Sequence, residues 1–237
     1  MTKTTKRLVL LIAFAVIIIF LVFSGFAFYK KEFLENPLSK AGDVNAANLY
    51  RLYILSDPKL GEMPYYGSQN ASISMVAFLD DSNSSLHFID STFGKIDDDF
   101  ISRGKIKFYI KGHLTQQDFV ERSNKFLYAA SLACMNSIKK GLQYKFYFDM
   151  IKNGLKNSHY LAQKYGAQGE ILDNCIKKII PDELREDALE VENFGISGVS
   201  PVFYIGIDGN DNTMLEGSQN YSEFNRTIRY YQFLIGN

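Results

Sequence analysis

The stretch that decides the fold is Gly195-Ile196-Ser197-Gly198-Val199-Ser200-Pro201 together with the apolar run that follows it. The two glycines and the proline indicate a loop, and the apolar, β-forming residues predict a strand over residues 201–207. Residues 208–212 have the composition of a hairpin turn, and a short returning strand is predicted over 214–217. The chain closes with a predicted helix over 221–235, in which apolar residues recur every three or four positions.

Upstream of this stretch, strand and helix signals precede a long helical block. Residues 72–79 read S-I-S-M-V-A-F-L, a short apolar run bounded by polar turns, which is typical of a buried strand. A helix is predicted over 86–101 and a second strand over 105–111. From 115 to about 178 the periodicity is helical, and glycines divide the block into several helices. This order predicts an α/β fold with one sheet that is interrupted by a helical subdomain.

The N-terminal segment predicts a membrane anchor. Residues 8–29 carry no charge and are nearly all apolar, and a helix of roughly 20 such residues spans a bilayer. A secretory signal cleaved near Ser24, Gly25 and Ala27 and a buried helix of a soluble protein are the alternatives. Basic residues before the apolar run favour a cytoplasmic N-terminus. We therefore expect a single-pass cell-membrane protein whose soluble domain is extracytoplasmic.

Composition and the positions of proline and glycine divide the chain into three parts. Residues 1–29 form the cytoplasmic tip and transmembrane anchor, and residues 30–66, rich in proline and glycine punctuators, read as a stalk or linker. Residues 67–237 form the domain, with its helical insert at about 115–185. The whole chain has 26 basic and 26 acidic residues, and this neutral balance argues against a nucleic-acid partner.

Several short strings within residues 67–237 resemble, in order and spacing, the DsbA family of thioredoxin-fold thiol-disulfide oxidoreductases. The strings are Gly67-Ser68-Gln69-Asn70-Ala71 with 73–78, Gly104-Lys105-Ile106-Lys107-Phe108, Ala129-Ala130 with Ala133-Cys134, Gly195 to Phe203, and Gly217 with Phe224. The resemblance implies a thioredoxin fold with an inserted helical subdomain.

The resemblance also implies a cis peptide bond between Ser200 and Pro201. In the family this loop exposes backbone beside the active site, where an extended polypeptide pairs as an added strand. Val199, Ser200 and Pro201 are therefore the candidate peptide-binding residues. The alternative from the residues alone is that Pro201 only begins an edge strand.

The cysteine pair that carries the family's chemistry is missing. A Cys-x-x-Cys follows the first core strand in the family, and the matching positions here are Ser82-Asn83-Ser84-Ser85, or 83–86 if a gap of one residue intervenes. Disulfide exchange requires a thiolate that forms a mixed disulfide, which a hydroxyl cannot do. The segment reads more simply as a serine-rich helix cap. We therefore identify the chain as a degenerate member with no catalytic residues in this motif.

The two cysteines of the chain do not restore the motif. Cys134 and Cys175 are 41 residues apart, and both fall in the predicted helical insert. In an oxidising compartment they could form a structural disulfide, which would stabilise the fold by about 4 kcal/mol. Two buried thiols that act as small apolar residues are the alternative.

Other polar residues give no recognisable cofactor or metal site. His87, His113 and His159 fit no metal-ligand spacing, and His87 is expected at the surface beside the serine motif. The acidic pairs and runs at Asp80-Asp81 and 97–99 could bind a cation, but a solvated acidic face beside a helix is the favoured interpretation. No cofactor and no metal are expected.

Three functions remain open from the sequence. The first is a redox-inactive module, anchored in the membrane, that binds extracytoplasmic polypeptides in the groove beside Pro201 as a chaperone or assembly factor. The second is a thiol-disulfide oxidoreductase that uses Cys134 and Cys175 or a partner's thiols. The third is a structural envelope protein without a working groove. Whether the chain is an enzyme is therefore uncertain at this point.

Overall fold

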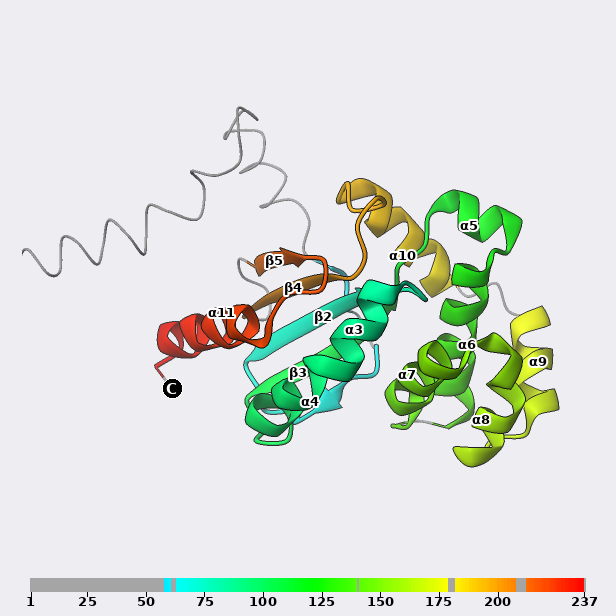
Figure 1. Ribbon diagram of the computed structural model, residues 1–237, viewed down its shortest axis with the longest axis horizontal. Coiled ribbons are helices and arrows are strands. Elements are labelled where there is room, and N and C mark those ends of the chain that lie inside the picture. The colour runs from blue at the N-terminus through cyan, green and yellow to red at the C-terminus, as the bar shows by residue number, and fades with distance from the viewer. Residues whose placement is uncertain (1–57, 61–62, 140, 179–181, 208–211, 237) are drawn as a thin grey trace, which may run out of the picture. The chain divides into compact units, whose positions relative to one another are not determined.

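A computed structural model describes most of the chain beyond the predicted stalk (Figure 1). The described residues are 58–60, 63–139, 141–178, 182–207 and 212–236. The predicted anchor and most of the predicted stalk lie outside these ranges. Within the described part of the chain, no helix is both long and apolar enough to cross a bilayer.

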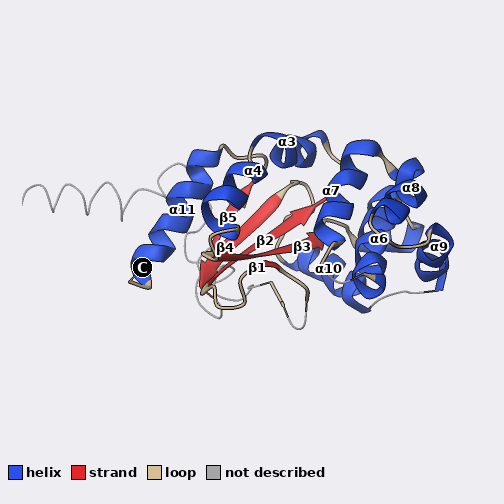
Figure 2. Cartoon of the chain, turned by 90° about the horizontal axis from the view of Figure 1, so that it is seen from below, coloured by secondary structure: helices blue, strands red, loops and turns tan. Residues whose placement is uncertain are grey.

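The described residues form one five-stranded sheet with the strand order β1-β3-β2-β4-β5 (Figure 2). The central pair β2 and β3 is parallel, and each of the other neighbouring pairs is antiparallel. The strands are Tyr66–Gly67 (β1), Ile73–Leu79 (β2), Ile106–Gly112 (β3), Val202–Ile207 (β4) and Asn212–Glu216 (β5). The predictions of β2, β3, β4 and β5 are therefore confirmed, whereas β1 was not predicted.

Both faces of the sheet are covered, which explains why β2 is apolar without alternation. Met75, Ala77 and Leu79 belong to the main core on one face, whereas Val76 and Phe78 belong to a second core on the opposite face. All seven residues of β2 are buried. A strand buried on both faces reads as a continuous apolar run, and each large side chain removed from water stabilises the fold by about 1.5–3 kcal/mol.

The helices lie around this sheet as two groups (Figures 1 and 2). One group follows β2 or closes the chain: α3 (Asn83–Ser91), α4 (Phe93–Ile96), a π-helical turn (Asp97–Ile101) and α11 (Tyr221–Leu234). The other group lies between β3 and β4: α5 (Gln116–Glu121), α6 (Asn124–Ile138), α7 (Gln143–Asn153), a 3-10 turn (Leu155–Asn157), α8 (Ser158–Lys164), α9 (Gly169–Lys178) and α10 (Asp182–Asn193).

The second group is the helical insert that the sequence predicts between the second and third core strands. A disulfide joins Cys134 of α6 to Cys175 of α9. Of the two alternatives that the sequence left open for these cysteines, the structure has the bonded pair. The bond lies inside the insert and therefore connects two helices of the same subdomain.

The predicted helix over 86–101 differs from the structure in two respects. It begins earlier, at Asn83, because the side chain of Ser82 accepts a hydrogen bond from the backbone N–H of Ser85 and caps the helix. It is also broken at Thr92, whose buried side chain donates a hydrogen bond to the carbonyl oxygen of Gln219. The early start matters for the site, because it fixes which serines stand at the head of the helix.

Candidate functional site

The head of helix α3 places two serine side chains in direct contact. Ser82 is the N-cap residue and Ser85 lies three residues further on, with the hydroxyl of Ser82 donating to the hydroxyl of Ser85 at 3.2 Å. These are the two outer positions of the Ser82-Asn83-Ser84-Ser85 segment. Of the two placements that the sequence allowed for the missing cysteine motif, the geometry favours 82–85, because only this one sets both outer side chains at the head of the helix.

A buried carboxylate lies directly behind the two serines. Asp80 is 3% exposed, and its Oδ1 atom accepts hydrogen bonds from the Ser85 hydroxyl at 3.1 Å and from the Ser82 backbone N–H at 3.1 Å. The hydroxyl of Ser200 donates to the same oxygen at 2.6 Å. The Oδ2 atom forms an ion pair with Lys125 at the start of α6, at 3.0 Å. Asp80 therefore bonds to three segments of the chain: the head of α3, the loop at Ser200 and the start of α6.

This arrangement corrects the sequence interpretation of Asp80 as part of a solvated acidic face. Burial would raise the pKa of the Asp80 carboxyl, but the hydrogen bonds from Ser200 and Ser82 and the charge of Lys125 outweigh it and lower the pKa to about 2. Asp80 is therefore ionised at neutral pH and satisfied by its partners. Its neighbour Asp81 is exposed, as expected.

The Ile196–Pro201 loop lies against the serine pair. The peptide bond between Ser200 and Pro201 is cis, as the resemblance implied. The hydroxyl of Ser200 lies 3.3 Å from that of Ser85, so the loop and the helix head are joined by side chains. Val199, which directly precedes Ser200 in the loop, exposes 37% of its surface. The structure thus brings together the candidate motif residues and the candidate loop residues that the sequence placed 115 positions apart.

A buried histidine connects the same carboxylate to the other end of the loop. His113 is 2% exposed, and its Nε2 atom lies 2.9 Å from the carbonyl oxygen of Ile196. Because a carbonyl only accepts, Nε2 carries the proton. The Nδ1 atom has no hydrogen-bond partner and lies 3.9 Å from Oδ2 of Asp80. His87 and His159 are exposed, and the described residues contain no cluster that could hold a metal ion.

A buried ion triad joins β3 to α10 and was not found from the sequence. Lys111 of β3 is 2% exposed and pairs with Asp187 at 3.0 Å and with Glu190 at 2.8 Å, both on α10. Burial would lower the pKa of Lys111, but the two carboxylates raise it. Burial raises the pKa of Asp187 to about 6, against the opposing pull of Lys111. No local signal distinguished Lys111, because the strand also carries Lys107.

The disulfide lies apart from the serine pair. Cys134 stands nine positions after Lys125 on the same helix, which corresponds to about 13 Å along the helix axis. Cys134 is buried and Cys175 is half-buried. Neither sulfur shares a hydrogen bond with the serine and aspartate network. The structure therefore does not join the two groups of candidate residues into one redox centre.

We compared the chain with known protein families, curated proteins and solved structures. No protein-family model matches the chain, and no curated protein matches it. Solved structures do: oxidised BdbD from Bacillus subtilis matches with a TM-score of 0.62 at 18% identity, over 74% of this chain and 96% of BdbD. The thiol-disulfide exchange protein alpha-DsbA2 from Wolbachia pipientis matches at 0.57 and 16%, over 78% and 92%. DsbA from Chlamydia trachomatis matches at 0.58 and 16%, over 76% and 96%. The chain has the DsbA fold.

This confirms the predicted thioredoxin fold with a helical insert. At these identities the likeness shows the fold and carries no activity across to this chain. Within the DsbA-like fold, Ser82 and Ser85 stand at the head of the helix after the first core strand, where the resemblance places the cysteine motif.

Proposed function

We propose that this DsbA-like protein is a redox-inactive polypeptide-binding module of the cell envelope. Its soluble domain would be extracytoplasmic and held at the cell membrane by the apolar segment over 8–29. It would bind extracytoplasmic polypeptides in the groove beside the Ser200–Pro201 bond, in a chaperone or assembly role. The observation that carries the proposal is the hydroxyl pair of Ser82 and Ser85, in contact with Ser200 of the loop at which we propose that polypeptides bind.

Two features support redox inactivity. The outer positions of the motif carry hydroxyl groups, which form no mixed disulfide with a substrate. The only two cysteines of the chain are bonded to each other in the helical insert. Exchange would therefore require that bond to open and to act far from the groove.

Two features support polypeptide binding. The loop is tied to the helix head through Ser200 and to the residue after β3 through the contact between Ile196 and His113. A rigid surface binds at a lower cost in conformational entropy. The side chain of Val199 remains partly exposed beside this fixed backbone. An apolar side chain next to accessible main chain suits an extended polypeptide that pairs through its backbone.

Redox inactivity is tested on the full-length chain, purified from an oxidising compartment. Alkylation followed by mass spectrometry should report Cys134 and Cys175 as bonded, and the protein should not accelerate insulin reduction by dithiothreitol. The control is the doubly substituted Cys134→Ser and Cys175→Ser variant, which should give the same rate. Turnover that disappears in this variant would place redox chemistry in the insert and overturn the proposal.

Polypeptide binding is tested with reduced, carboxymethylated α-lactalbumin, an unfolded probe without free thiols. Val199→Asp should weaken binding at least about fivefold, the usual threshold for an important interface residue. The matched control is Phe233→Asp on α11, where the side chain is 79% exposed and lies outside the loop. Equal affinity of wild type and Val199→Asp for the probe would refute polypeptide binding at this loop. No binding by wild type would favour a structural envelope role instead.

A further inference from the structure

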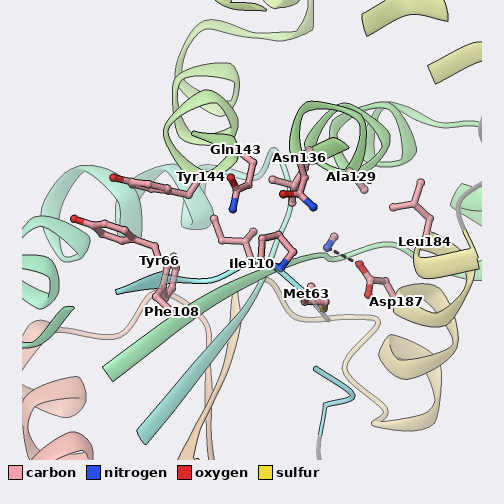
Figure 3. A pocket seen from close by; sticks show the side chains of 14 residues that line it. Met63, Tyr66, Phe108, Ile110, Ala129, Asn136, Gln143, Tyr144, Leu184 and Asp187 are labelled. Carbon is pink, nitrogen blue, oxygen red and sulfur yellow. Dashed lines mark hydrogen bonds between the residues drawn. The ribbon is translucent and has the colours of Figure 1, made fainter. Parts of the chain in front are cut away.

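A cavity of about 50 Å³ lies between strand β3 and the helices α6, α7 and α10 (Figure 3). It lies away from the serine pair and the loop, and none of the groove candidates lines it. Its walls are mostly apolar, with Phe108 and Ile110 from the sheet and Leu132 and Leu184 from the helices. Figure 3 shows the stacked rings of Tyr66 and Tyr144 at one end.

Two amide side chains enter this apolar space with unused acceptors. Gln143, the first residue of α7, is 5% exposed, and its Oε1 atom is buried without a hydrogen-bond partner. Asn136 of α6 likewise has a buried Oδ1 atom without a partner. Figure 3 shows both side chains pointing from the helices toward the sheet. A buried acceptor left unbonded costs about 1–3 kcal/mol, so a donor is expected to complete this site.

The charge next to the cavity selects the kind of donor. Asp187 lines the cavity on the side away from Gln143, and its Oδ2 atom accepts a hydrogen bond from the backbone N–H of Gly112 at 3.1 Å. Asp187 and Glu190 share a single buried cation, Lys111. This leaves one negative charge in excess within the triad, in a region of low dielectric where it acts strongly. A cationic donor is therefore favoured over a neutral one.

We propose that this cavity binds a primary ammonium group on a short alkyl chain. The ammonium N–H groups would donate to Oε1 of Gln143 and Oδ1 of Asn136, with the carboxylate of Asp187 as the compensating charge. The alkyl carbons would lie against Phe108 and Ile110. At roughly 10–15 Å³ for each water-sized atom, the cavity holds about four heavy atoms, which matches n-propylammonium or the end of a lysine side chain.

The test is isothermal titration of the full-length chain with n-propylammonium chloride in a nonionic detergent. A ligand of four heavy atoms is expected to bind with a dissociation constant on the order of 1 mM. Two control ligands separate the contributions: 1-propanol has the same shape without the charge, and tetramethylammonium has the charge without N–H donors. Both should bind at least about tenfold more weakly, as expected for a site that requires a charged donor.

Gln143→Leu replaces the amide side chain with an apolar one of similar size and removes the acceptor. It should weaken n-propylammonium at least about tenfold without lowering the midpoint of thermal unfolding, because an unbonded buried acceptor is lost. Gln117→Leu, at an exposed position on α5, is the matched control and should leave the affinity unchanged. Asn136→Leu provides a second variant if Gln143→Leu does not fold.

The source of the ammonium is distinguished by a second titration. If Nα-acetyl-lysine amide binds as tightly as n-propylammonium, the site admits a side chain of a polypeptide. If only n-propylammonium binds, the ligand is a free small amine. The proposal would be overturned if n-propylammonium did not bind at a concentration 20-fold above the expected dissociation constant. It would also be overturned if Gln143→Leu left the dissociation constant unchanged. The cavity would then be filled by water alone. The polypeptide groove is tested separately, through Val199, so either proposal can fail alone.

Discussion

The sharpest prediction concerns Asp80→Asn. The pKa of this carboxyl is about 2 in the folded protein against 3.8 in the unfolded chain, and each unit of difference corresponds to 1.36 kcal/mol. Ionised Asp80 therefore stabilises the folded state by about 2 kcal/mol. Because the folded-state value is the lower one, this contribution is complete above about pH 4 and is lost as the pH falls toward 2.

The substitution removes the charge but keeps the shape. At pH 7, Asp80→Asn should lower the free energy of unfolding by about 2 kcal/mol or slightly more, since Lys125 loses its carboxylate and the donors on Ser200 and Ser82 bond to a neutral amide oxygen instead. Near pH 2 the wild-type carboxyl is about half protonated, so the difference between the two proteins should become much smaller. The pH dependence of the difference separates a charge effect from a general loss of packing.

The assay is urea unfolding of the full-length chain at several pH values from 2 to 7. Far-UV circular dichroism is the suitable probe, because the chain has no tryptophan. Asp90→Asn is the matched control: Asp90 forms a surface ion pair with Lys152 at 2.7 Å and is half exposed, so the substitution should cost less than about 1 kcal/mol. A difference between wild type and Asp80→Asn that is the same at pH 3 and pH 7 would refute the reasoning.

Two further predictions address the buried cation and the disulfide. Lys111→Met should destabilise the fold by about 3–5 kcal/mol, because it leaves two buried carboxylates without their cation. Lys152→Met at the surface is the control. A similar small loss of unfolding free energy in both variants would contradict a buried triad. Removing the disulfide with Cys134→Ala and Cys175→Ala together should lower the free energy of unfolding by about 4 kcal/mol. The affinity for carboxymethylated α-lactalbumin should stay at the wild-type value. A loss of affinity in the folded variant would contradict this prediction and show that the insert supports the binding surface.

The fold could be predicted where burial leaves a simple pattern. Strands β2 and β4 are buried almost throughout, so their apolar runs stand out from the polar turns around them. Strand β1 escaped because it has only two residues, Tyr66 and Gly67, which is too short for any periodicity. The break at Thr92 was not predicted for a different reason: the hydrogen-bond partner of Thr92, the carbonyl of Gln219, is 127 positions away in the sequence.

The site could be predicted in part. The positions of Ser82 and Ser85 followed from the distance to the preceding strand, and the cis bond before Pro201 followed from the resemblance. The role of Asp80 did not, because a carboxylate is expected in solvent unless partners compensate it, and its partners Ser200 and Lys125 come from distant segments. Local sequence indicates which side chains are polar, but tertiary contacts decide which polar side chains are buried.

The hydrogen bonds of Asp80 also bear on whether a dithiol could work at this site. Ser82→Cys with Ser85→Cys would supply the two sulfur atoms that a dithiol needs, and the helix N-terminus would favour a thiolate at position 82. At position 85, however, the new sulfur would face a carboxylate that now accepts from the Ser85 hydroxyl at 3.1 Å. A neighbouring negative charge opposes thiol ionisation. The charge of Asp80 therefore disfavours a thiolate at position 85, so a dithiol introduced at this site would ionise first at position 82.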